Sequence, residues 1–231
     1  MAYQFGFVDR VLLKIRSIIK PLTRNYYSRR LKCTNFTIIS NNCWGGVVYD
    51  NLGLQKKSPT VGCYFFADDY VKFLHNLKYY LSLEIIIIDA KDSRHAEVLS
   101  QKNQLDIPVG VLDDVEIMFL HYKDPIVAKE TWMRRCKRVN WDNIIYKFSY
   151  MNGCNDTILS EFEVIKGVKK ICFVERNHPE YKDTVLMPFV VNGQVADDTS
   201  YWNRHFDIVG FINASTEDLD EYWSKQKRSR K

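Results

Sequence analysis

The sequence predicts a single α/β domain, with a mostly parallel or mixed sheet that carries helices on both faces. Its composition is that of a globular protein, with 46% hydrophobic residues, 26% charged residues and a mean hydropathy of -0.30. Apolar β-rich runs alternate with helical patterns, and parallel strands require such crossovers. No internal repeat or long linker interrupts this alternation. We therefore expect the domain at residues 33–214, between a basic amphipathic extension at 1–32 and a charged tail at 215–231.

Runs rich in β-branched and aromatic residues mark the expected strands. The first run reads NFTIIS at residues 35–40 and precedes a loop that contains glycine. The later runs are residues 84–89, 115–121, 143–150, 170–175 and 185–191. Because the carboxyl ends of parallel strands meet at one edge of a sheet, we expect a site in the loops that follow these runs.

Amphipathic spacing and terminal residues mark the expected helices. In the stretch 124–138, Asp124 can cap the helix and Pro125 stands in its first turn, where proline is tolerated. The stretch 155–165 is closed by Gly167. Further helices are expected at 68–82 and 205–214.

The first segment of the chain is basic and amphipathic. Between Val8 and Leu22, apolar residues recur at steps of three and four, and Pro21 is expected to close the helix. Such a helix suits the surface of an anionic membrane, which is therefore an expected partner of residues 8–32. A first helix packed on the domain and a mobile leader are the alternatives.

The charges are unevenly distributed, with basic ends around an acidic body. Residues 1–32 hold eight basic side chains and one acidic side chain, and residues 225–231 add five basic ones. Residues 33–224 keep 20 basic and 27 acidic side chains, so the body has a net charge of -7 although the whole chain carries +5. A domain that binds nucleic acid concentrates Lys and Arg on its folded surface, so nucleic acid is not an expected partner.

The six cysteines are scattered, without a C-x-x-C pair or a short Cys/His cluster. This pattern indicates reduced thiols, and we expect neither a metal nor a cofactor. Residues 1–20 lack the apolar core of a secretory signal, and the longest aliphatic run, Ile85 to Ile88, is far shorter than a membrane span. We expect a cytoplasmic protein, free or peripheral at the inner face of the cell membrane.

The most unusual stretch follows the first expected strand and reads SNNCWGG at residues 40–46. Two glycines after a polar loop let backbone amides approach a phosphate, and a neighbouring tryptophan can stack on a sugar or base. The stretch matches neither the dinucleotide-binding nor the P-loop pattern. A turn in which the asparagines satisfy their own backbone is the alternative. The candidate site residues here are Ser40, Asn41, Asn42, Cys43, Trp44, Gly45 and Gly46.

Two further polar stretches extend this candidate site. Ser58 and Thr60 flank a proline in an extended loop and offer hydroxyls to a ligand, with capping as the alternative role. His121 and Tyr122 end an expected strand at the same sheet edge, where an imidazole can accept or give a proton. The alternative for His121 is a histidine held by structural hydrogen bonds.

The expected helix 124–138 carries a pair of arginines on one face. Arg135 and Arg138 are three residues apart, so both guanidinium groups can reach one phosphate or carboxylate. A solvated basic face or a set of salt bridges is the alternative. Asn140 and Asp142 follow directly in the sequence.

These stretches resemble the signature of an uncharacterised bacterial domain family whose members are commonly labelled exopolysaccharide biosynthesis proteins. The resemblance spans residues 36–214 and rests on the S-N-N-C-W-G-G string with the S-P-T, H-Y and W-x-x-R-x-x-R-x-N motifs. It implies an α/β fold and a role in capsule or other surface-glycan assembly, and it supplies no catalytic residues. Asn140 and Asp142 join the candidate binding residues as part of the last motif.

Three functions are compatible with these residues. The first, which we expect, is a transferase that acts on a nucleotide sugar, a lipid phosphate or another phosphorylated glycan intermediate, with Arg135 and Arg138 on the phosphate and His121 as general base. We expect it to be metal-independent, because the only Asp-x-Asp triplet, at 218–220, lies outside the resemblance. The second is a Cys43 nucleophile activated by His121 for acyl transfer or ester hydrolysis on a glycan substituent, with a buried, inert Cys43 as its alternative. The third is a non-catalytic accessory protein that binds glycan or phosphate.

Overall fold

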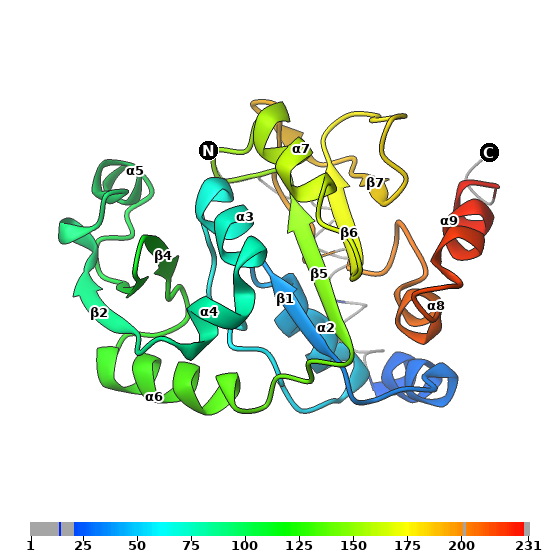
Figure 1. Cartoon of the computed structure of the whole chain (residues 1–231), viewed down its shortest axis with the longest axis horizontal. Coiled ribbons are helices and arrows are strands. Elements are labelled where there is room, and N and C mark those ends of the chain that lie inside the picture. Colours follow the sequence, from blue (N-terminus) through cyan, green and yellow to red (C-terminus); the bar gives the residue numbers. More distant parts are fainter. Residues whose placement is uncertain (1–13, 15–20, 201, 229–231) are drawn as a thin grey trace.

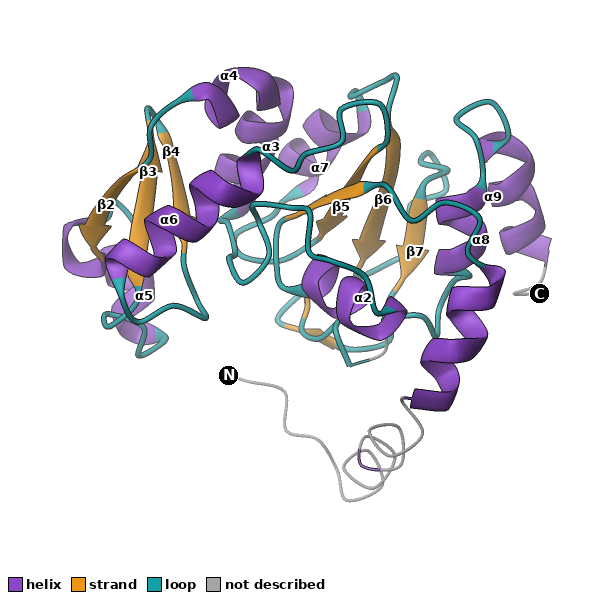
Figure 2. Cartoon of the chain, turned by 90° about the horizontal axis from the view of Figure 1, so that it is seen from below, coloured by secondary structure: helices purple, strands orange, loops and turns teal. Residues whose placement is uncertain are grey.

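The computed structural model describes residues 14, 21–200 and 202–228 and confirms the predicted α/β class. A four-stranded parallel sheet forms the centre of the molecule, and a three-stranded antiparallel sheet lies beside it (Figures 1 and 2). The named helices, in chain order, are α2 (Trp44–Leu52), α3 (Ala67–His75), α4 (Leu77–Ser82), the 3-10 helix η1 (Ala90–Asp92), α5 (Ala96–Gln101), α6 (Pro125–Cys136), α7 (Asp156–Glu163), α8 (Ile208–Asn213) and α9 (Leu219–Arg228).

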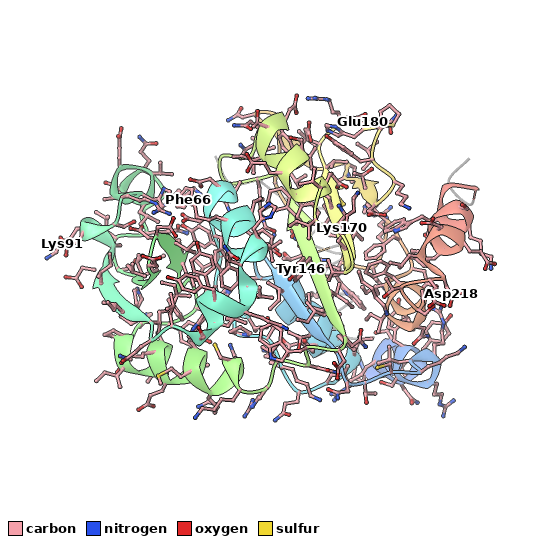
Figure 3. The ribbon with its side chains drawn as sticks, viewed as in Figure 1. Phe66, Lys91, Tyr146, Lys170, Glu180 and Asp218 are labelled. Atoms are coloured by element: carbon pink, nitrogen blue, oxygen red, sulfur yellow. The ribbon has the colours of Figure 1, made fainter. Side chains whose placement is uncertain are left out.

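The parallel sheet has the strand order β1-β5-β6-β7, and all of its pairings are parallel. Its strands are β1 (Thr37–Ser40), β5 (Ile144–Ser149), β6 (Lys169–Val174) and β7 (Thr184–Leu186). Tyr146 of β5 lies opposite Lys170 of β6, and both are labelled in Figure 3. All residues of β1 and β6 are buried, as expected of parallel strands that are covered on both faces.

Successive side chains of each strand point to opposite faces of the sheet, so the core has two layers. On one face, Phe148 of β5 packs against Tyr70 of α3 and Phe162 of α7. On the other face, Phe173 of β6 packs edge-on against Trp44 at the start of α2. The sheet is therefore covered on both sides, as the sequence predicts.

The second sheet is antiparallel, with the order β2-β3-β4. It contains β2 (Ile86–Asp89), β3 (Pro108–Leu112) and β4 (Val115–Met118), and α6 packs across β2 and β3. A tight turn joins β3 to β4, and Asp113 in this turn takes a left-handed conformation (φ 55°) that aspartate tolerates. The predicted strands at 84–89 and 115–121 thus belong to this separate sheet rather than to the parallel one, and the second of them ends early, at Met118.

Side chains cap two helices, and the cap at Asp124 is the one that the sequence predicts. The Asp124 side chain accepts hydrogen bonds from the amides of Ile126 and Val127 and caps α6, and Asn155 caps α7 in the same way. The single helix predicted at 68–82 is wrong, because the chain breaks at Asn76 into α3 and α4. The amphipathic pattern continues across the break, so periodicity alone could not show it.

Helix α2 begins within the polar loop that the SNNCWGG stretch predicts, so the loop is reduced to the turn at residues 41–43. Glycine disfavours a helix, but here it allows the helix to approach β1. A Cβ atom on Gly45 would lie 3.1 Å from Cγ2 of Ile38, and one on Gly46 would lie 3.0 Å from Cγ1 of Val61. Close packing therefore accounts for both glycines.

The end of the chain forms additional elements beyond the sheet. The predicted strand at 185–191 is divided, because its first part belongs to β7 and its last part to β8 (Val190–Val191). Strand β8 forms a hairpin with β9 (Gln194–Val195), and Gly193 lies in the turn between them at φ 71°. Helix α9 lies in the segment expected to be a charged tail, and its Trp223 is buried against the core.

The described part of the N-terminal segment is helical and packs on the domain. Residues 21–30 form helix, so Pro21 is itself helical. The helix that Pro21 was predicted to close lies, apart from Lys14 and residues 21–22, outside the described residues. The Ser28 hydroxyl donates to the carbonyl of Leu52, and Arg30 pairs with Asp207. Apart from Lys14, the predicted membrane-binding residues 8–20 lie outside the described residues. Among the helices of the described chain, none combines the length and apolar character needed to cross a bilayer.

Candidate functional site

A cavity of about 370 Å³ opens at the carboxyl edge of the parallel sheet. It lies where the loops after β1 and β5 meet the segments that follow β4 and β9. Parallel α/β sheets bind ligands at this edge. The residues that line the cavity are Asn42, Cys43, Tyr64, Lys102, Gln104, Leu120, His121, Met151, Asn152, Ala196, Asp197, Asp198 and Thr199.

Cys43 and His121 meet at this cavity from different sheets. Cys43 Sγ lies 3.2 Å from Nε2 of His121, within hydrogen-bond reach for sulfur. Cys43 is the N-cap residue of α2, so the start of the helix fixes its backbone. The His121 amide donates to the carbonyl of Gly62, which holds the imidazole over the cysteine. Cys43 is partly buried and His121 is exposed, so both side chains are accessible from the cavity.

The Cys43 thiol is protonated at neutral pH. Burial, and to a smaller extent the negative charge of Asp198, raise the pKa of Cys43 to about 11, although the Lys147 ammonium acts in the opposite direction. The resting pair is therefore a neutral thiol beside an imidazole. A thiolate forms when His121 takes the proton.

Asn41 continues the pairing of β1 with β5 through its side chain. Its Nδ2 donates to the carbonyl of Ser149 (3.0 Å), and its Oδ1 accepts from the amide of the same residue (3.0 Å). These two bonds reproduce a strand ladder one residue beyond β1. The fully buried Asn41 thereby fixes the point at which the chain turns towards Cys43.

Asn42 connects this turn to charged groups beneath it. Its Oδ1 accepts hydrogen bonds from the amide of Trp44 (3.1 Å), from Lys147 Nζ (2.8 Å) and from the hydroxyl of Ser40 (3.2 Å). Its Nδ2 donates to both carboxylate oxygens of Asp198 (3.0 and 2.9 Å). Asn42 therefore satisfies a first-turn amide of α2 while two opposite charges hold its side chain in place.

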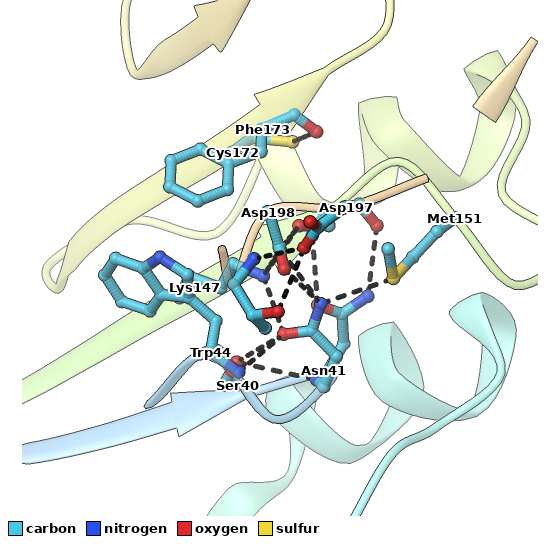
Figure 4. A network of polar contacts seen from close by, with 12 residues as sticks. Ser40, Asn41, Trp44, Lys147, Met151, Cys172, Phe173, Asp197 and Asp198 are labelled. Atoms are coloured by element: carbon cyan, nitrogen blue, oxygen red, sulfur yellow. Dashed lines mark hydrogen bonds and ion pairs between the residues drawn. The ribbon is translucent and has the colours of Figure 1, made fainter. Parts of the chain in front are cut away.

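Lys147 and Asp198 form an ion pair under the cavity, with side chains 0% and 1% exposed (Figure 4). Lys147 Nζ also donates to the hydroxyl of Ser149 (2.6 Å), which in turn donates to Asp198. The rings of Trp44 and Phe173 lie 5.6 and 5.1 Å from the ammonium. Burial lowers the pKa of Lys147, and Asp198 opposes this effect. Because every charge in this network has a partner, the network is rigid and fixes the floor of the cavity.

Comparison with known proteins places the chain in a family. The model of a domain of unknown function, DUF1919, matches residues 14–213. The chain belongs to this family. An uncharacterized protein of Haemophilus influenzae is 28% identical to it over 212 residues, which cover 87% of this chain and 97% of that protein. The resemblance to an uncharacterised domain family is confirmed at this level, and the exopolysaccharide label stays an expectation.

In this DUF1919 domain, the aromatic residue of the SNNCWGG stretch is a core residue. Trp44 is fully buried and stacks on Phe206 as well as meeting Phe173. It does not line the cavity, so the structure does not place it where it could stack on a sugar.

Ser58 and Thr60 lie behind β1, where they hold the strand. Both are fully buried, and Thr60 Oγ1 accepts a hydrogen bond from the amide of Ser40 (3.1 Å) while lying 3.0 Å from Ser58 Oγ. Both hydroxyl groups are thus hydrogen-bonded inside the protein. They match the structural alternative considered for this segment.

The two arginines of the expected phosphate clamp are not brought together at the cavity. Arg135 donates to the carbonyl of Val61 (2.6 Å) and to the hydroxyl of Tyr122 (2.8 Å). Helix α6 ends at Cys136, so Arg138 lies beyond it and the predicted common helix face does not form. Neither arginine lines the cavity, and neither does Tyr122.

Asn140 and Asp142 lie at the opposite, amino edge of the parallel sheet. The Asn140 side chain donates to the carbonyl of Asn35, and its amide donates to Thr37 at the start of β1. Asp142 lines a broader hollow of about 1020 Å³ at that edge. The structure thus brings Asn42, Cys43 and His121 together and leaves these two residues apart from them.

Sequence reasoning missed Lys147, Ser149 and Asp198. One signal was present, because Lys147 interrupts an otherwise apolar run, IIYKFSY, and a lysine inside a buried strand requires a partner. Nothing in the sequence identifies that partner, since Asp198 lies 51 residues away in an irregular segment.

Proposed function

We propose that this DUF1919 domain transfers or hydrolyses acyl groups through a covalent intermediate on Cys43. The observation that carries the proposal is the 3.2 Å separation of Cys43 Sγ and His121 Nε2 at a cavity. A nucleophile within hydrogen-bond reach of a base is the arrangement that covalent acyl-transfer enzymes share. A glycan that carries an acyl substituent is the substrate class suggested by the resemblance of the sequence.

The contact singles out one cysteine. Cys63, Cys154 and Cys172 are buried, and burial raises the pKa of each thiol. Within the described residues, the hydrogen bonds of the cysteines include only one with an imidazole, that of Cys43. Cys43 is therefore the thiol that can lose its proton to a neighbouring base.

In each half of the reaction, His121 accepts one proton and gives one proton up. As Cys43 Sγ attacks the acyl carbon, its proton passes to Nε2 of His121, and the carbonyl electrons move to oxygen. When the tetrahedral intermediate collapses, the bond to the leaving alkoxide breaks and His121 returns the proton to that oxygen. Water or an acceptor hydroxyl then gives its proton to His121 and attacks the thioester carbon. When this second intermediate collapses, the bond to sulfur breaks and His121 returns the proton to Sγ, which restores the Cys43 thiol.

The start of α2 supplies positive partial charge beside the sulfur. Cys43 caps a helix of nine residues, and the amides of Gly45 and Gly46 have no hydrogen-bond acceptor among the described residues. The N-terminal end of a helix stabilises a nearby thiolate or oxyanion. This stabilisation opposes the effect of burial at the moment when negative charge develops.

The expected sugar transferase is a separate proposal that the cavity supports less. It requires arginines on the phosphate groups of the donor, but Arg135 is bonded to Val61 and Tyr122 and lies outside the cavity lining. Arg138 is also outside that lining. The cavity offers Lys102 as a cation, whose ammonium contacts the side-chain oxygen of Asn152 (3.1 Å).

The test is acetylation of the full chain by p-nitrophenyl acetate, followed by intact mass and by release of p-nitrophenolate. We expect one acetyl group on Cys43 and continued turnover. Cys43→Ala abolishes both, and His121→Asn slows acetylation by about 10²- to 10⁴-fold because the general base is lost. Cys136→Ala removes another partly buried thiol and serves as the matched control, which retains activity. Turnover that persists in Cys43→Ala contradicts the proposal.

A further inference from the structure

A second cluster of polar side chains lies at the carboxyl edge of the parallel sheet. Glu175 directly follows β6, His178 comes three residues later, and Asp156 begins α7 after β5. One ligand atom from each of these residues lies within 4.8 Å of the other two. None of the three lines the cavity of Cys43, so the cluster is separate from the proposed acyl-transfer site.

Two atoms of this cluster are buried without a hydrogen-bond partner among the described residues. They are Nε2 of His178 and Oε2 of Glu175, on side chains that are 3% and 6% exposed. Nε2 of His178 is 3.5 Å from the other Glu175 oxygen, which is too long for a good hydrogen bond. Buried polar atoms are nearly always satisfied, so this pair points to a ligand that contacts both residues.

The other ring nitrogen of His178 has a carboxylate behind it. Nδ1 lies 3.1 Å from Oε1 of Glu180, which is labelled in Figure 3. A carboxylate can only accept, so in the neutral imidazole this contact places the proton on Nδ1 and the lone pair on Nε2. Histidines that ligate metals usually have this kind of partner, which fixes the ring and raises its basicity.

An arginine now supplies positive charge to the same carboxylates. Arg176 Nη2 lies 2.8 Å from Asp156 Oδ2, and Nη1 lies 3.2 Å from Glu175 Oε1. The Arg176 side chain is 57% exposed, and ion pairs exposed to this extent contribute little free energy. A divalent cation can therefore replace the guanidinium, which is free to turn into solvent.

We propose that Asp156, Glu175 and His178 bind a divalent first-row transition metal ion of the Zn²⁺ type. Two carboxylate oxygens and one imidazole nitrogen provide three ligands of a tetrahedral site and leave the fourth position to water. The imidazole favours Zn²⁺ over Mg²⁺ and Ca²⁺, which prefer oxygen ligands. The bound ion ties the end of β6 to the start of α7.

The same chain contains a matched control cluster. Asp68, Asp69 and His95 also offer three ligand atoms within 4.8 Å. There, however, Nε2 of His95 already contacts Asp69 Oδ2 at 2.8 Å, and the other oxygen of Asp69 accepts from Arg94. Because the ring nitrogen and the buried carboxylate are satisfied, we expect no metal at this second cluster.

The test is calorimetric titration of the metal-stripped full chain with ZnCl₂, followed by metal analysis after gel filtration. We expect one Zn²⁺ per chain, lost in His178→Gln and retained in His95→Gln, and no binding of Mg²⁺. Glu180→Gln weakens binding by about 10- to 100-fold because the partner behind the imidazole is removed. Glu180 is exposed, so this variant keeps the test decisive if His178→Gln does not fold.

Two further measurements distinguish this metal site from zinc held by thiols and from a plain ion-pair network. Thiols also bind zinc, so the chain is loaded with Co²⁺, and the expected spectrum lacks a thiolate charge-transfer band. Arg176→Gln is expected to tighten metal binding, whereas a cluster that is only an ion-pair network would bind no metal in this variant either. Zinc binding that is unchanged in both His178→Gln and Glu180→Gln, or a thiolate band on Co²⁺, overturns the proposal.

Discussion

Cys43 and His121 approach each other to 3.2 Å across the junction between the two sheets. Cys43 follows β1 of the parallel sheet, whereas His121 follows β4 of the antiparallel sheet. The segment around Tyr64 joins the two sheets, because Tyr64 exchanges backbone hydrogen bonds with Met118 of β4 (2.9 and 2.8 Å) and the amide of Phe65 donates to the carbonyl of Asn41 after β1 (3.0 Å). The thiol and the imidazole therefore meet only when the two sheets are packed together.

The reactivity of Cys43 is expected to rise steeply with pH. The thiolate is the species that iodoacetamide alkylates, and a pKa of about 11 leaves its fraction growing about tenfold per pH unit up to that value. An unperturbed cysteine levels off near pH ~8.5. Timed alkylation at increasing pH, with peptide mass spectrometry, measures the rate at Cys43. A rate that is flat above pH ~9 would mean that burial does not raise this pKa.

Removal of one charge from the buried ion pair is expected to destabilise the fold strongly. Lys147→Met leaves the Asp198 carboxylate buried without its counter-ion, and we expect the free energy of unfolding to fall by about 3–5 kcal/mol. The double variant Lys147→Met with Asp198→Asn removes both charges and should recover much of that loss. Urea unfolding of the wild type, of Lys147→Met and Asp198→Asn as single variants, and of the double variant measures the difference. If the double variant is as unstable as the sum of the single losses, the pair is not coupled.

A methyl group at position 45 is expected to push α2 away from β1. In Gly45→Ala the added Cβ would lie 3.1 Å from Cγ2 of the fully buried Ile38. We expect a net loss of about 1–3 kcal/mol in the free energy of unfolding, although alanine is the better helix former. Asp50→Ala on the exposed face of the same helix is the control, with a change within about 0.5 kcal/mol. A stabilised Gly45→Ala variant would show that the helix needs no close approach.

Loss of the cap of α6 is expected to have a moderate effect. Asp124→Ala leaves the amides of Ile126 and Val127 without their acceptor, at a cost of about 1 kcal/mol in the free energy of unfolding. Thermal or urea unfolding detects this loss, and Asp124→Asn should retain most of the stability because asparagine also caps. Equal stability of the alanine and asparagine variants would exclude a capping role.

The sequence predicts β1, β5 and β6 well because each is a largely apolar run near turn signals, whereas the run at 185–191 is divided between β7 and β8. Asp124 and Asn155 also identify two helix starts, since capping depends on local residue types. The separate antiparallel sheet could not be predicted in this way. Its strands are equally apolar, and only long-range pairing such as Ile88 with Val109 decides which sheet a run joins.

The candidate site was predictable in part. Its polar loop is conspicuous in the sequence, and the Cys43–His121 hypothesis could be stated before any geometry was known. The sequence could not show that Arg135 and Thr60 are bonded within the protein and do not line the cavity. A hydroxyl or guanidinium that binds the protein has the same sequence signal as one that binds a ligand. The partner of Lys147 was equally hidden, since an aspartate in an irregular segment carries no positional pattern.

The link between Lys147 and Asp198 also sets when the site can form during protein synthesis. A nascent chain that has passed β5 but not yet reached residue 198 holds the Lys147 ammonium without its counter-ion and Asn42 without the carboxylate that its side-chain amide binds. The neighbours of the thiol are thus complete only after residue 198 has been synthesised. Chains that end before residue 198 therefore lack the ion pair that forms the floor of the cavity beneath Cys43.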